Sequence, residues 1–224
     1  MVEIITVYGK LMLRAMEQTL LLALCGLFFA CILGLIFGLM SVTKYRACRI
    51  ISLIFVDVIR GVPMIVLAYF VFFGIPFLWN NILRIGGMTL TALTAGTICL
   101  ALNCGAYMSE IIRAGIQSVD KGQMEAARSL GLSYATAMRR VVLPQAIRTM
   151  IPSIINQFII TLKDTSILSV IGFPELVNTT KNVVAITFKS FQAWGIAAVM
   201  YLVVITLLSR LAKVVERRLN RGRE

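Results

Sequence analysis

The sequence contains no histidine and few charged residues. Charged residues make up 14% of its 224 positions and hydrophobic residues 59%, whereas ordinary soluble domains carry about 25% charged residues. A chain without histidine has no imidazole metal ligand and no histidine base for a serine or cysteine nucleophile. The composition therefore indicates an integral membrane protein and excludes histidine-dependent catalysis.

Paired cysteines and phosphate-binding glycine loops are missing as well. The five cysteines show no Cys-x-x-Cys spacing, and four of them fall in predicted membrane spans, so small apolar packing is their expected role. No Gly-x-x-x-x-Gly-Lys-Ser/Thr sequence occurs, and the chain is not expected to hydrolyse ATP by itself. We therefore expect no metal site, no cofactor bound by this chain and no enzymatic activity of its own.

Five stretches are apolar and long enough to cross a bilayer, which takes about 20 residues in a helix. They cover roughly residues 18–40, 52–75, 89–112, 146–171 and 193–208. The polar segment 172–192 is expected outside, in part as a short interfacial or re-entrant helix. No internal repeat or linker divides the chain, so the sequence predicts one all-α transmembrane domain over residues 1–224.

Lysine and arginine are distributed unequally between the two sides of this arrangement. Fifteen of the 22 basic residues fall on the side of the C-terminus and five on the other side, while Arg60 and Lys163 lie within spans. The positive-inside rule then places the N-terminus outside and the C-terminus in the cytoplasm. Topology and contact with anionic lipid account for the net charge of +12 without a nucleic-acid partner.

Small residues form a regular stripe on the first predicted span. Gly26, Ala30, Gly34 and Gly38 recur every four residues, which places them on one face of a helix. Small side chains let helices approach closely in lipid, where the hydrophobic effect does not drive their association. The stripe therefore predicts a helix-packing face.

Residues 113–145 form a polar, basic segment between the third and fourth spans, and such a segment cannot lie in lipid. Asp120 and Gln123 have the spacing of a capping box, which predicts the start of a helix at residue 121. Gly131 is a usual residue just past a helix end. The segment is therefore expected to begin with a short helix that ends at this glycine.

A second short helix is expected after the glycine. Ser133 is placed to cap residues 134–142, and Pro144 is expected to stop that helix. Ala126 and Ala127 keep one side of the predicted helix-turn-helix thin, which suits insertion into a groove of another protein. An amphipathic hairpin that contacts only lipid is the alternative.

The motifs of this segment resemble those of a known family. The order Glu125-Ala126-Ala127, Gly131 and Leu143-Pro144 resembles the EAA loop by which ABC-importer permeases dock onto their ATPase subunits. Further motifs resemble the permeases for histidine, glutamine, arginine and glutamate, and they are Tyr107–Ile116, Arg60-Gly61-Val62-Pro63 and Lys163-Asp164-Thr165-Ser166. The similarity covers about residues 18–218. Val62 is a mild departure, because the family often has a small hydroxyl residue there.

The resemblance implies an ABC type I importer-like permease fold in a bacterial inner or plasma membrane. It implies a second permease, either a copy or a paralogue, and two ATPase subunits that bind ATP and Mg²⁺ and dock on the EAA loop. It also implies an extracytoplasmic binding protein or domain that delivers a polar or charged amino acid. The coupling residues would be Glu125, Ala126, Ala127, Gly131, Leu143 and Pro144.

Polar residues fall on one face of the third span and on one face of the fourth. They are Asn103, Tyr107 and Glu110 on the third span, and Gln157, Thr161 and Asp164 on the fourth. These faces are expected to line a polar path, since an amino acid needs an anion for its ammonium and donors for its carboxylate. An acidic Asp164 or Glu110 would favour a basic substrate. The alternative for Glu110 is an ion pair with Arg113 at the cytoplasmic interface.

Three further charges lie in or near predicted spans. A charge at the bilayer centre costs about 2.5–3.5 kcal/mol, so such residues usually face a bundle interior or a water-filled path. Asp57 and Arg60 are three residues apart and share a helix face, which predicts an ion pair with a structural or a gating role. Lys163 is expected to bind the substrate carboxylate or to pair within the bundle, and Pro63 is expected to kink its span.

Other functions stay open from the sequence. One is a permease of the same architecture for another solute, such as methionine, an osmolyte or a peptide. Another is a channel or secondary carrier that works without ATP, although the thin Ala126-Ala127 segment would then have no partner. A membrane enzyme is a third possibility, but no catalytic cluster supports it.

Overall fold

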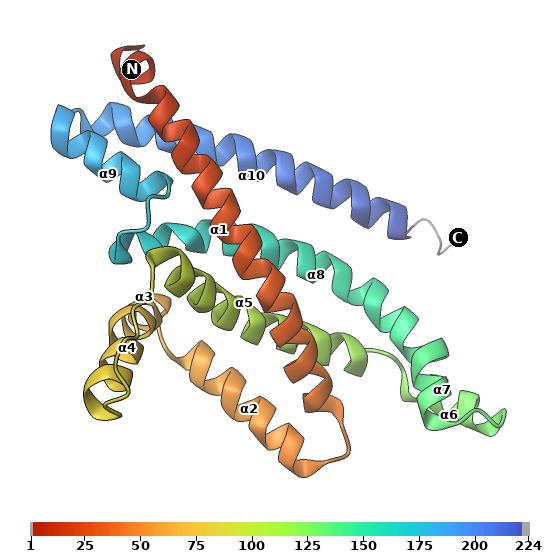
Figure 1. The fold of residues 1–224 in the computed structure, drawn as a ribbon. Coiled ribbons are helices and arrows are strands. Elements are labelled where there is room, and N and C mark those ends of the chain that lie inside the picture. The colour runs from red at the N-terminus through yellow and green to blue at the C-terminus, as the bar shows by residue number, and fades with distance from the viewer. Residues whose placement is uncertain (1, 221–224) are drawn as a thin grey trace.

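The computed structural model describes residues 2–220, with side chains described for residues 3–214. Within residues 2–220 every regular element is a helix and no strand occurs (Figure 1). Five helical segments are long and apolar enough to cross a membrane, namely Glu3–Val42, Met64–Ile82, Ala92–Gln117, Tyr134–Ile171 and Ser190–Val214. The predicted all-α fold with five spans is confirmed.

The helices follow one another with short connections. In chain order they are α1 (Val2–Val42), α2 (Arg46–Gly61), α3 (Met64–Tyr69), the π-helical turn η1 (Phe70–Gly74), α4 (Ile75–Phe77), the π-helical turn η2 (Leu78–Ile82), α5 (Ala92–Gln117), α6 (Lys121–Ser129), α7 (Tyr134–Ala137), the π-helical turn η3 (Met138–Val142), α8 (Leu143–Asp164), the 3₁₀ helix η4 (Thr165–Ile171), α9 (Leu176–Thr187) and α10 (Ser190–Asn220).

The predicted glycine stripe on α1 packs closely against α5. A Cβ atom at Gly26 would lie 2.6 Å from Cβ of Leu100, and one at Gly38 would lie 2.8 Å from Cβ of Ile112. A Cβ atom at Gly34 would overlap Cβ of Met108. Only glycine permits this approach of the two helices, so the stripe is a packing face, as the sequence predicts.

The second span differs from its predicted bounds. A single helix over residues 52–75 is expected from the sequence, but α2 ends at Gly61 and α3 begins at Met64. Val62 and Pro63 are extended between them, with ψ angles of 129° and 136°. A proline disfavours the helical conformation of the residue before it, so the kink expected at Pro63 is a complete interruption of the helix. The membrane-spanning helix therefore runs from Met64 to Ile82.

Helix α1 begins well before the predicted start of the first span at residue 18. Its first turns bury Ile4 and Met12 in an apolar cluster with Leu176 and Val183 of α9 and with residues of α10. Charged residues at positions 10, 14 and 17 dilute the hydrophobicity of this stretch. Hydropathy alone therefore misses the extension, which exists because its apolar residues recur at helical spacing.

The start of α9 is held by a buried carboxylate. Glu175 has no exposed surface, and its side chain accepts hydrogen bonds from the backbone amides of Val177 and Asn178 and from the hydroxyl of Tyr201 on α10. Burial raises the pKa of Glu175, and these hydrogen bonds and the nearby Lys181 only partly offset that rise. This carboxylate fixes α9 to α10 at the end of the molecule where α1 begins (Figure 1).

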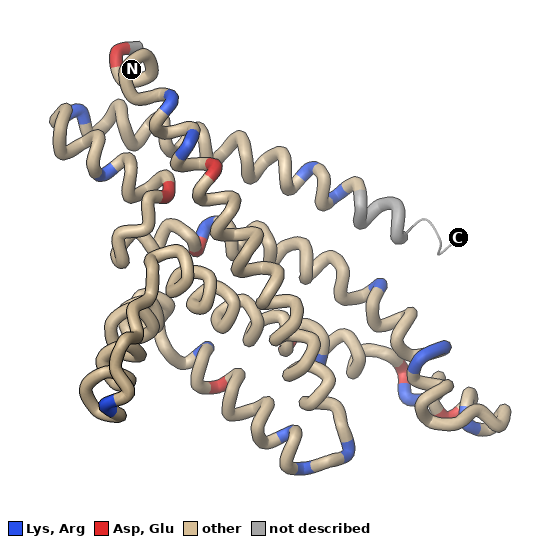
Figure 2. Tube along the Cα trace, viewed as in Figure 1, with Lys and Arg blue, Asp and Glu red and all other residues tan. Residues whose placement is uncertain are grey.

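The first and the last described turns of the chain lie at opposite sides of the helix bundle (Figure 1). The start of α1 lies near α9, while α6, α7 and the last turns of α10 lie toward the other side (Figure 1). Basic residues gather where α2 starts and around α6 and α7 (Figure 2). This arrangement fits the orientation that the basic residues predict, with α6 and α7 in the cytoplasm.

Candidate functional site

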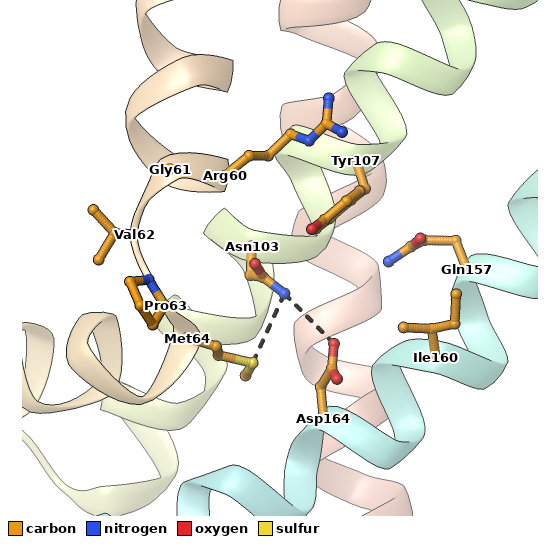
Figure 3. A pocket seen from close by; sticks show the side chains of 10 residues that line it. All are labelled: Arg60, Gly61, Val62, Pro63, Met64, Asn103, Tyr107, Gln157, Ile160 and Asp164. Carbon is orange, nitrogen blue, oxygen red and sulfur yellow. Dashed lines mark hydrogen bonds between the residues drawn. The ribbon is translucent and has the colours of Figure 1, made fainter.

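Two adjoining cavities lie between α5 and α8. The outer cavity, of about 480 Å³, is lined by the junction of α2 with α3 and by residues of α5 and α8, all drawn in Figure 3. The inner cavity, of about 470 Å³, lies nearer to α6 and is lined by polar residues that include Glu110, Ser118, Thr149 and Ser153. Both volumes fall in the range of about 300–1,000 Å³ that is usual for small-ligand sites.

Three residues line both cavities and therefore mark their junction. They are Arg60 at the end of α2, Tyr107 on α5 and Gln157 on α8. The guanidinium carbon of Arg60 lies 4.8 Å from the centre of the Tyr107 ring, a cation–π distance. Arg60 belongs to the junction because the interruption of the helix at Val62 and Pro63 ends α2 beside α5.

Asp164 brings a negative charge to the outer cavity. The amide nitrogen of Asn103 on α5 donates to one carboxylate oxygen of Asp164 over 3.5 Å and lies 3.7 Å from the sulfur of Met64. Figure 3 shows the carboxylate directed into the cavity. Within the described part of the chain, no lysine or arginine forms an ion pair with Asp164, so its charge is available to a cationic group in the cavity.

Glu110 has a different role from Asp164, because it is already paired. Its two carboxylate oxygens accept hydrogen bonds from Arg113 over 2.9 and 2.6 Å, in a bidentate ion pair. Arg113 also donates a hydrogen bond to Gln117 over 3.2 Å. Arg60 approaches Glu110 only to 3.9 Å. The alternative in which Glu110 pairs with Arg113 is therefore the one observed, although Glu110 still lines the inner cavity.

The structure brings together most, but not all, of the predicted path residues. Asn103, Tyr107, Gln157 and Asp164 line the outer cavity. Thr161 does not contribute: it is completely buried, and among the described residues that line the two cavities it does not occur. Gln157, Thr161 and Asp164 share a face of α8, as their spacing predicts, but neighbouring side chains cover Thr161 completely.

The predicted ion pair between Asp57 and Arg60 does not form. Asp57 is exposed and, among the residues with described side chains, forms no ion pair, whereas Arg60 extends toward Tyr107 and Glu110 on α5. Arg60 therefore contacts residues of the neighbouring helix α5 and not Asp57 on its own helix. Lys163 is also exposed and lines neither cavity within the part of the chain described, so its predicted contact with the solute is not supported.

The hairpin formed by α6 and α7 has the predicted caps. The side chain of Asp120 accepts from the amide of Gly122 over 2.7 Å, and that of Ser133 accepts from the amide of Thr136 over 3.3 Å. Gln123 does not close the expected capping box on Asp120; its side chain accepts from Gln145 on α8 over 3.3 Å. This hydrogen bond ties the hairpin to α8.

A glycine closes the turn between α6 and α7. Gly131 has a φ of +84°, its amide donates to Arg128 over 3.0 Å, and the amide of Leu132 donates to Ala127 over 3.2 Å. These two bonds define a Schellman motif, which places a left-handed residue just past the helix. The turn therefore depends on glycine.

The exposed surface of the hairpin differs in part from the predicted one. Glu125 and Ala126 are exposed, but Ala127 is buried, so only one of the two alanines lies on the free surface. Leu130 is 84% exposed and Tyr134 is 54% exposed. Sequence analysis missed these two apolar residues, although their position in a polar, water-facing segment could have marked them.

The helix that follows the hairpin does not stop at Pro144. Residues 134–164 are helical throughout, with the π-helical turn η3 directly before Leu143 and Pro144. Proline has no amide hydrogen and its ring crowds the carbonyl four residues earlier. The wider π turn accommodates it, so Pro144 is exposed on a continuous helix that links the hairpin to the cavities.

Comparison with known proteins identifies similar chains. The family model described as "Binding-protein-dependent transport system inner membrane component" matches residues 19–221. The glutamine transport system permease protein GlnP of Escherichia coli K12 is 34% identical over 210 residues, which cover 94% of this chain and 93% of that protein. The probable amino-acid permease protein YxeN of Bacillus subtilis is 35% identical over 210 residues, or 94% of this chain and 92% of that protein.

Two solved structures resemble the fold over nearly its whole length. One is described as an amino acid ABC transporter with histidines; it has a TM-score of 0.87 and 37% identity and covers 96% of both chains. The other is the MetNI methionine ABC transporter in an inward-facing conformation, with a TM-score of 0.78 and 20% identity, covering 95% of this chain and 97% of that one. At that identity the second likeness shows the fold alone.

Proposed function

Because the chain belongs to the family of binding-protein-dependent transport system inner membrane components, we propose that it is the permease subunit of an ATP-driven importer for a polar or charged amino acid. The cavities between α5 and α8 form the path of the solute. The α6–α7 hairpin receives the motion of the ATPase. The chain itself is a multi-pass inner-membrane protein.

The observation that carries the proposed path is Asp164, whose carboxylate faces the outer cavity without an ion-pair partner among the described residues. An ionisable residue within a membrane span usually marks a substrate or ion pathway. Asp164 faces a cavity of suitable volume, together with the amide of Asn103. A carboxylate in this position suits the ammonium group that every amino acid carries, and it would also favour a basic side chain.

The proposed coupling rests on the shape of the α6–α7 hairpin and on its connections. Its tip presents Glu125, Ala126 and Leu130 to water, and the Schellman turn at Gly131 joins its two helices. Helix α5 enters the hairpin directly, and the continuous helix after Ser133 leaves it for Asp164. A displacement of the hairpin would therefore move both walls of the cavities.

The proposed partners follow from the family and from the names of relatives. We infer two ATPase subunits, which bind ATP and Mg²⁺, a second permease that is a copy or a paralogue, and an external binding protein or domain. The relatives named for glutamine and the transporter solved with histidines favour an amino acid over another solute. The chain is a transport subunit, and ATP hydrolysis belongs to its partner.

Co-purification followed by reconstitution tests this function. The chain is expressed with candidate ATPase and binding-protein subunits from the same organism, and uptake of radiolabelled amino acids into proteoliposomes is measured with and without ATP. We expect an ATPase to co-purify and uptake to require ATP. Flux that proceeds without ATP or an ATPase partner would instead establish a channel or secondary carrier.

A further inference from the structure

A further, smaller cavity lies between α8 and α10, on the side of α8 that faces away from the proposed path. Its volume is about 200 Å³, and its polar lining consists of Asn156 on α8 and of Ser209 and Lys213 on α10. Among the described residues that line the two cavities between α5 and α8, none of these three occurs. Passage of the solute therefore does not explain this cavity.

Asn156 is a polar residue on an exposed face of a membrane span. It belongs to the span Tyr134–Ile171, its side chain is exposed, and within residues 3–214 its side-chain amide has no hydrogen-bond partner. A polar group without a partner is costly in hydrocarbon. Groups from outside these residues are therefore needed to satisfy the amide, and lipid headgroups supply them at the edge of a bilayer.

The length of α10 places Ser209 and Lys213 at that edge. The hydrocarbon core is about 30 Å thick, which a helix crosses in about 20 residues at about 1.5 Å per residue. A span that starts at Ser190 therefore reaches the other edge of the core near Ser209. Lys213 lies one helical turn further on, at the level of the headgroups, on the side that the positive-inside rule assigns to the cytoplasm.

Positive charge flanks the cavity on both helices. Arg148 is exposed and precedes Pro152, which lines the cavity, by four residues, so the two share a face of α8. Figure 2 shows basic residues and no acidic ones on the described last turns of α10. Among the described side chains, no carboxylate forms an ion pair with Arg148 or Lys213. The cavity therefore attracts an anion.

The sequence extends the basic cluster beyond Lys213. Positions 210–223 contain six basic residues and one acidic residue, Glu216. Clusters of about four to eight basic residues directly after a membrane helix attract anionic lipids, and basic pockets between helices on the cytoplasmic side bind anionic headgroups. The end of α10 combines both features, because the cavity lies at the start of the cluster.

The surroundings of the cavity fit a lipid better than a soluble anion. Ile155 and Ile159 of α8 line it beside the polar residues. On the hydrocarbon side of Ser209, α10 exposes Val203 and Leu207. An acyl chain covers these apolar side chains while its phosphate stays at the level of Lys213, whereas a free phosphate leaves them uncovered.

We propose that this cavity binds the headgroup of an anionic phospholipid of the cytoplasmic leaflet. Lys213 and Arg148 supply the charge for the phosphate, and Asn156 and Ser209 donate hydrogen bonds to its oxygens. The lipid holds α10 to α8, which matters because only 6% of the most apolar stretch of α10 is buried within the described chain. The inference concerns a lipid and does not depend on which solute is transported.

Lipid binding to the delipidated protein tests the inference. The full chain, with the subunits that co-purify with it, is titrated in detergent with phosphatidylglycerol or with phosphatidylcholine of the same acyl chains, and native mass spectrometry counts the bound lipids. We expect one phosphatidylglycerol per chain to bind more tightly than phosphatidylcholine. Lys213→Gln and Arg148→Gln should each weaken its binding by about fivefold, the usual contribution of one basic residue near an anionic lipid surface, and Asn156→Leu by a smaller factor.

Two controls separate this site from a general effect of charge and from a site for soluble anions. Arg49→Gln removes an exposed basic residue of α2, on the same side of the membrane, and changes the net charge by the same amount as Lys213→Gln without altering the cavity. Its affinity for phosphatidylglycerol should equal that of wild type. Inorganic phosphate in excess should not displace the bound lipid.

Each of the other results overturns the inference. Weakening by Arg49→Gln as large as that by Lys213→Gln would show a diffuse effect of charge, and equal affinity for phosphatidylcholine would show that the anionic headgroup is not recognised. Displacement by inorganic phosphate would establish a site for a soluble anion instead. If Lys213→Gln does not fold, Arg148→Gln and Asn156→Leu still report the affinity, and wild-type binding in both contradicts the proposed site.

Discussion

Asn103 on α5 and Asp164 on α8 meet across the outer cavity, where the amide nitrogen lies 3.5 Å from the carboxylate oxygen. Their helices are the two that flank the α6–α7 hairpin in the chain. The contact is long for a hydrogen bond and joins the two walls of the proposed path. The proposed coupling predicts that a movement of the hairpin opens or closes this contact.

Asp164→Asn is expected to reduce amino-acid uptake by about tenfold or more, because the substitution removes the charge that faces the ammonium group. The loss should be greatest for basic amino acids. The measurement is ATP-dependent uptake into proteoliposomes over a panel of amino acids. Asp57→Asn is the matched control, since Asp57 is exposed outside the cavities. An unchanged rate and substrate profile in Asp164→Asn would leave Asp164 with a structural role.

Gly131→Val is expected to impair coupling, whereas Gly131→Asn should be tolerated. Space is not the reason, because a Cβ atom at Gly131 would meet nothing within 4 Å. The left-handed conformation costs an ordinary L-residue about 1–2 kcal/mol, and asparagine adopts it more readily. Substrate-stimulated ATPase activity of the assembled transporter measures the effect. Equal activity in the two variants would contradict a role for the strained turn.

Gly34→Ala is expected to lower the stability of the protein by about 1–3 kcal/mol, the usual cost of overpacking. The added methyl group would overlap Met108 on α5. Gly9→Ala on the same helix is the control, because its Cβ atom would meet only Ile5 at 3.7 Å. Thermal unfolding in detergent compares the two. A variant at Gly34 as stable as the one at Gly9 would show that α1 and α5 do not depend on close contact.

The stability of the protein should depend on pH through Glu175. Burial raises the pKa of this carboxyl in the folded protein above its ordinary value of 4.5, so the folded state holds the proton more tightly than the unfolded state. The resulting stabilisation is complete below pH 4.5 and is lost as the pH rises through the folded pKa. Thermal unfolding midpoints from pH 4.5 to 8 measure it.

The variant Glu175→Gln isolates this contribution, since glutamine does not titrate. The difference in midpoint between wild type and Glu175→Gln should change to the disadvantage of wild type as the pH rises. A difference that is constant over the range, or that moves in favour of wild type, would contradict a raised pKa for Glu175.

The sequence predicts those features that depend on local spacing. The stripe of Gly26, Gly34 and Gly38 repeats with the period of a helix, and it packs against α5 as expected. Asp120 and Ser133 cap their helices because an N-cap needs only the next two or three amides. Likewise, Asn103 and Gln157 line the cavity as predicted, and the signal in the sequence is that they are polar residues in apolar spans.

The features that depend on a neighbouring helix are not predicted. Arg60 contacts Tyr107 on α5 and not Asp57 on its own helix, and the spacing of residues in the sequence cannot predict that contact. Pro144 does not end its helix, because a π turn precedes it. Ala127 is buried, although its neighbour Ala126 is exposed. In each case the result depends on how separate helices pack.

The structure of the assembled transporter with its amino acid bound, determined by cryo-electron microscopy, tests the proposed path most directly. Density for the amino acid is expected in the outer cavity, with its cationic part within hydrogen-bonding distance of Asp164. An amino acid bound elsewhere in the membrane, with side chains closing the space between α5 and α8, would contradict the account.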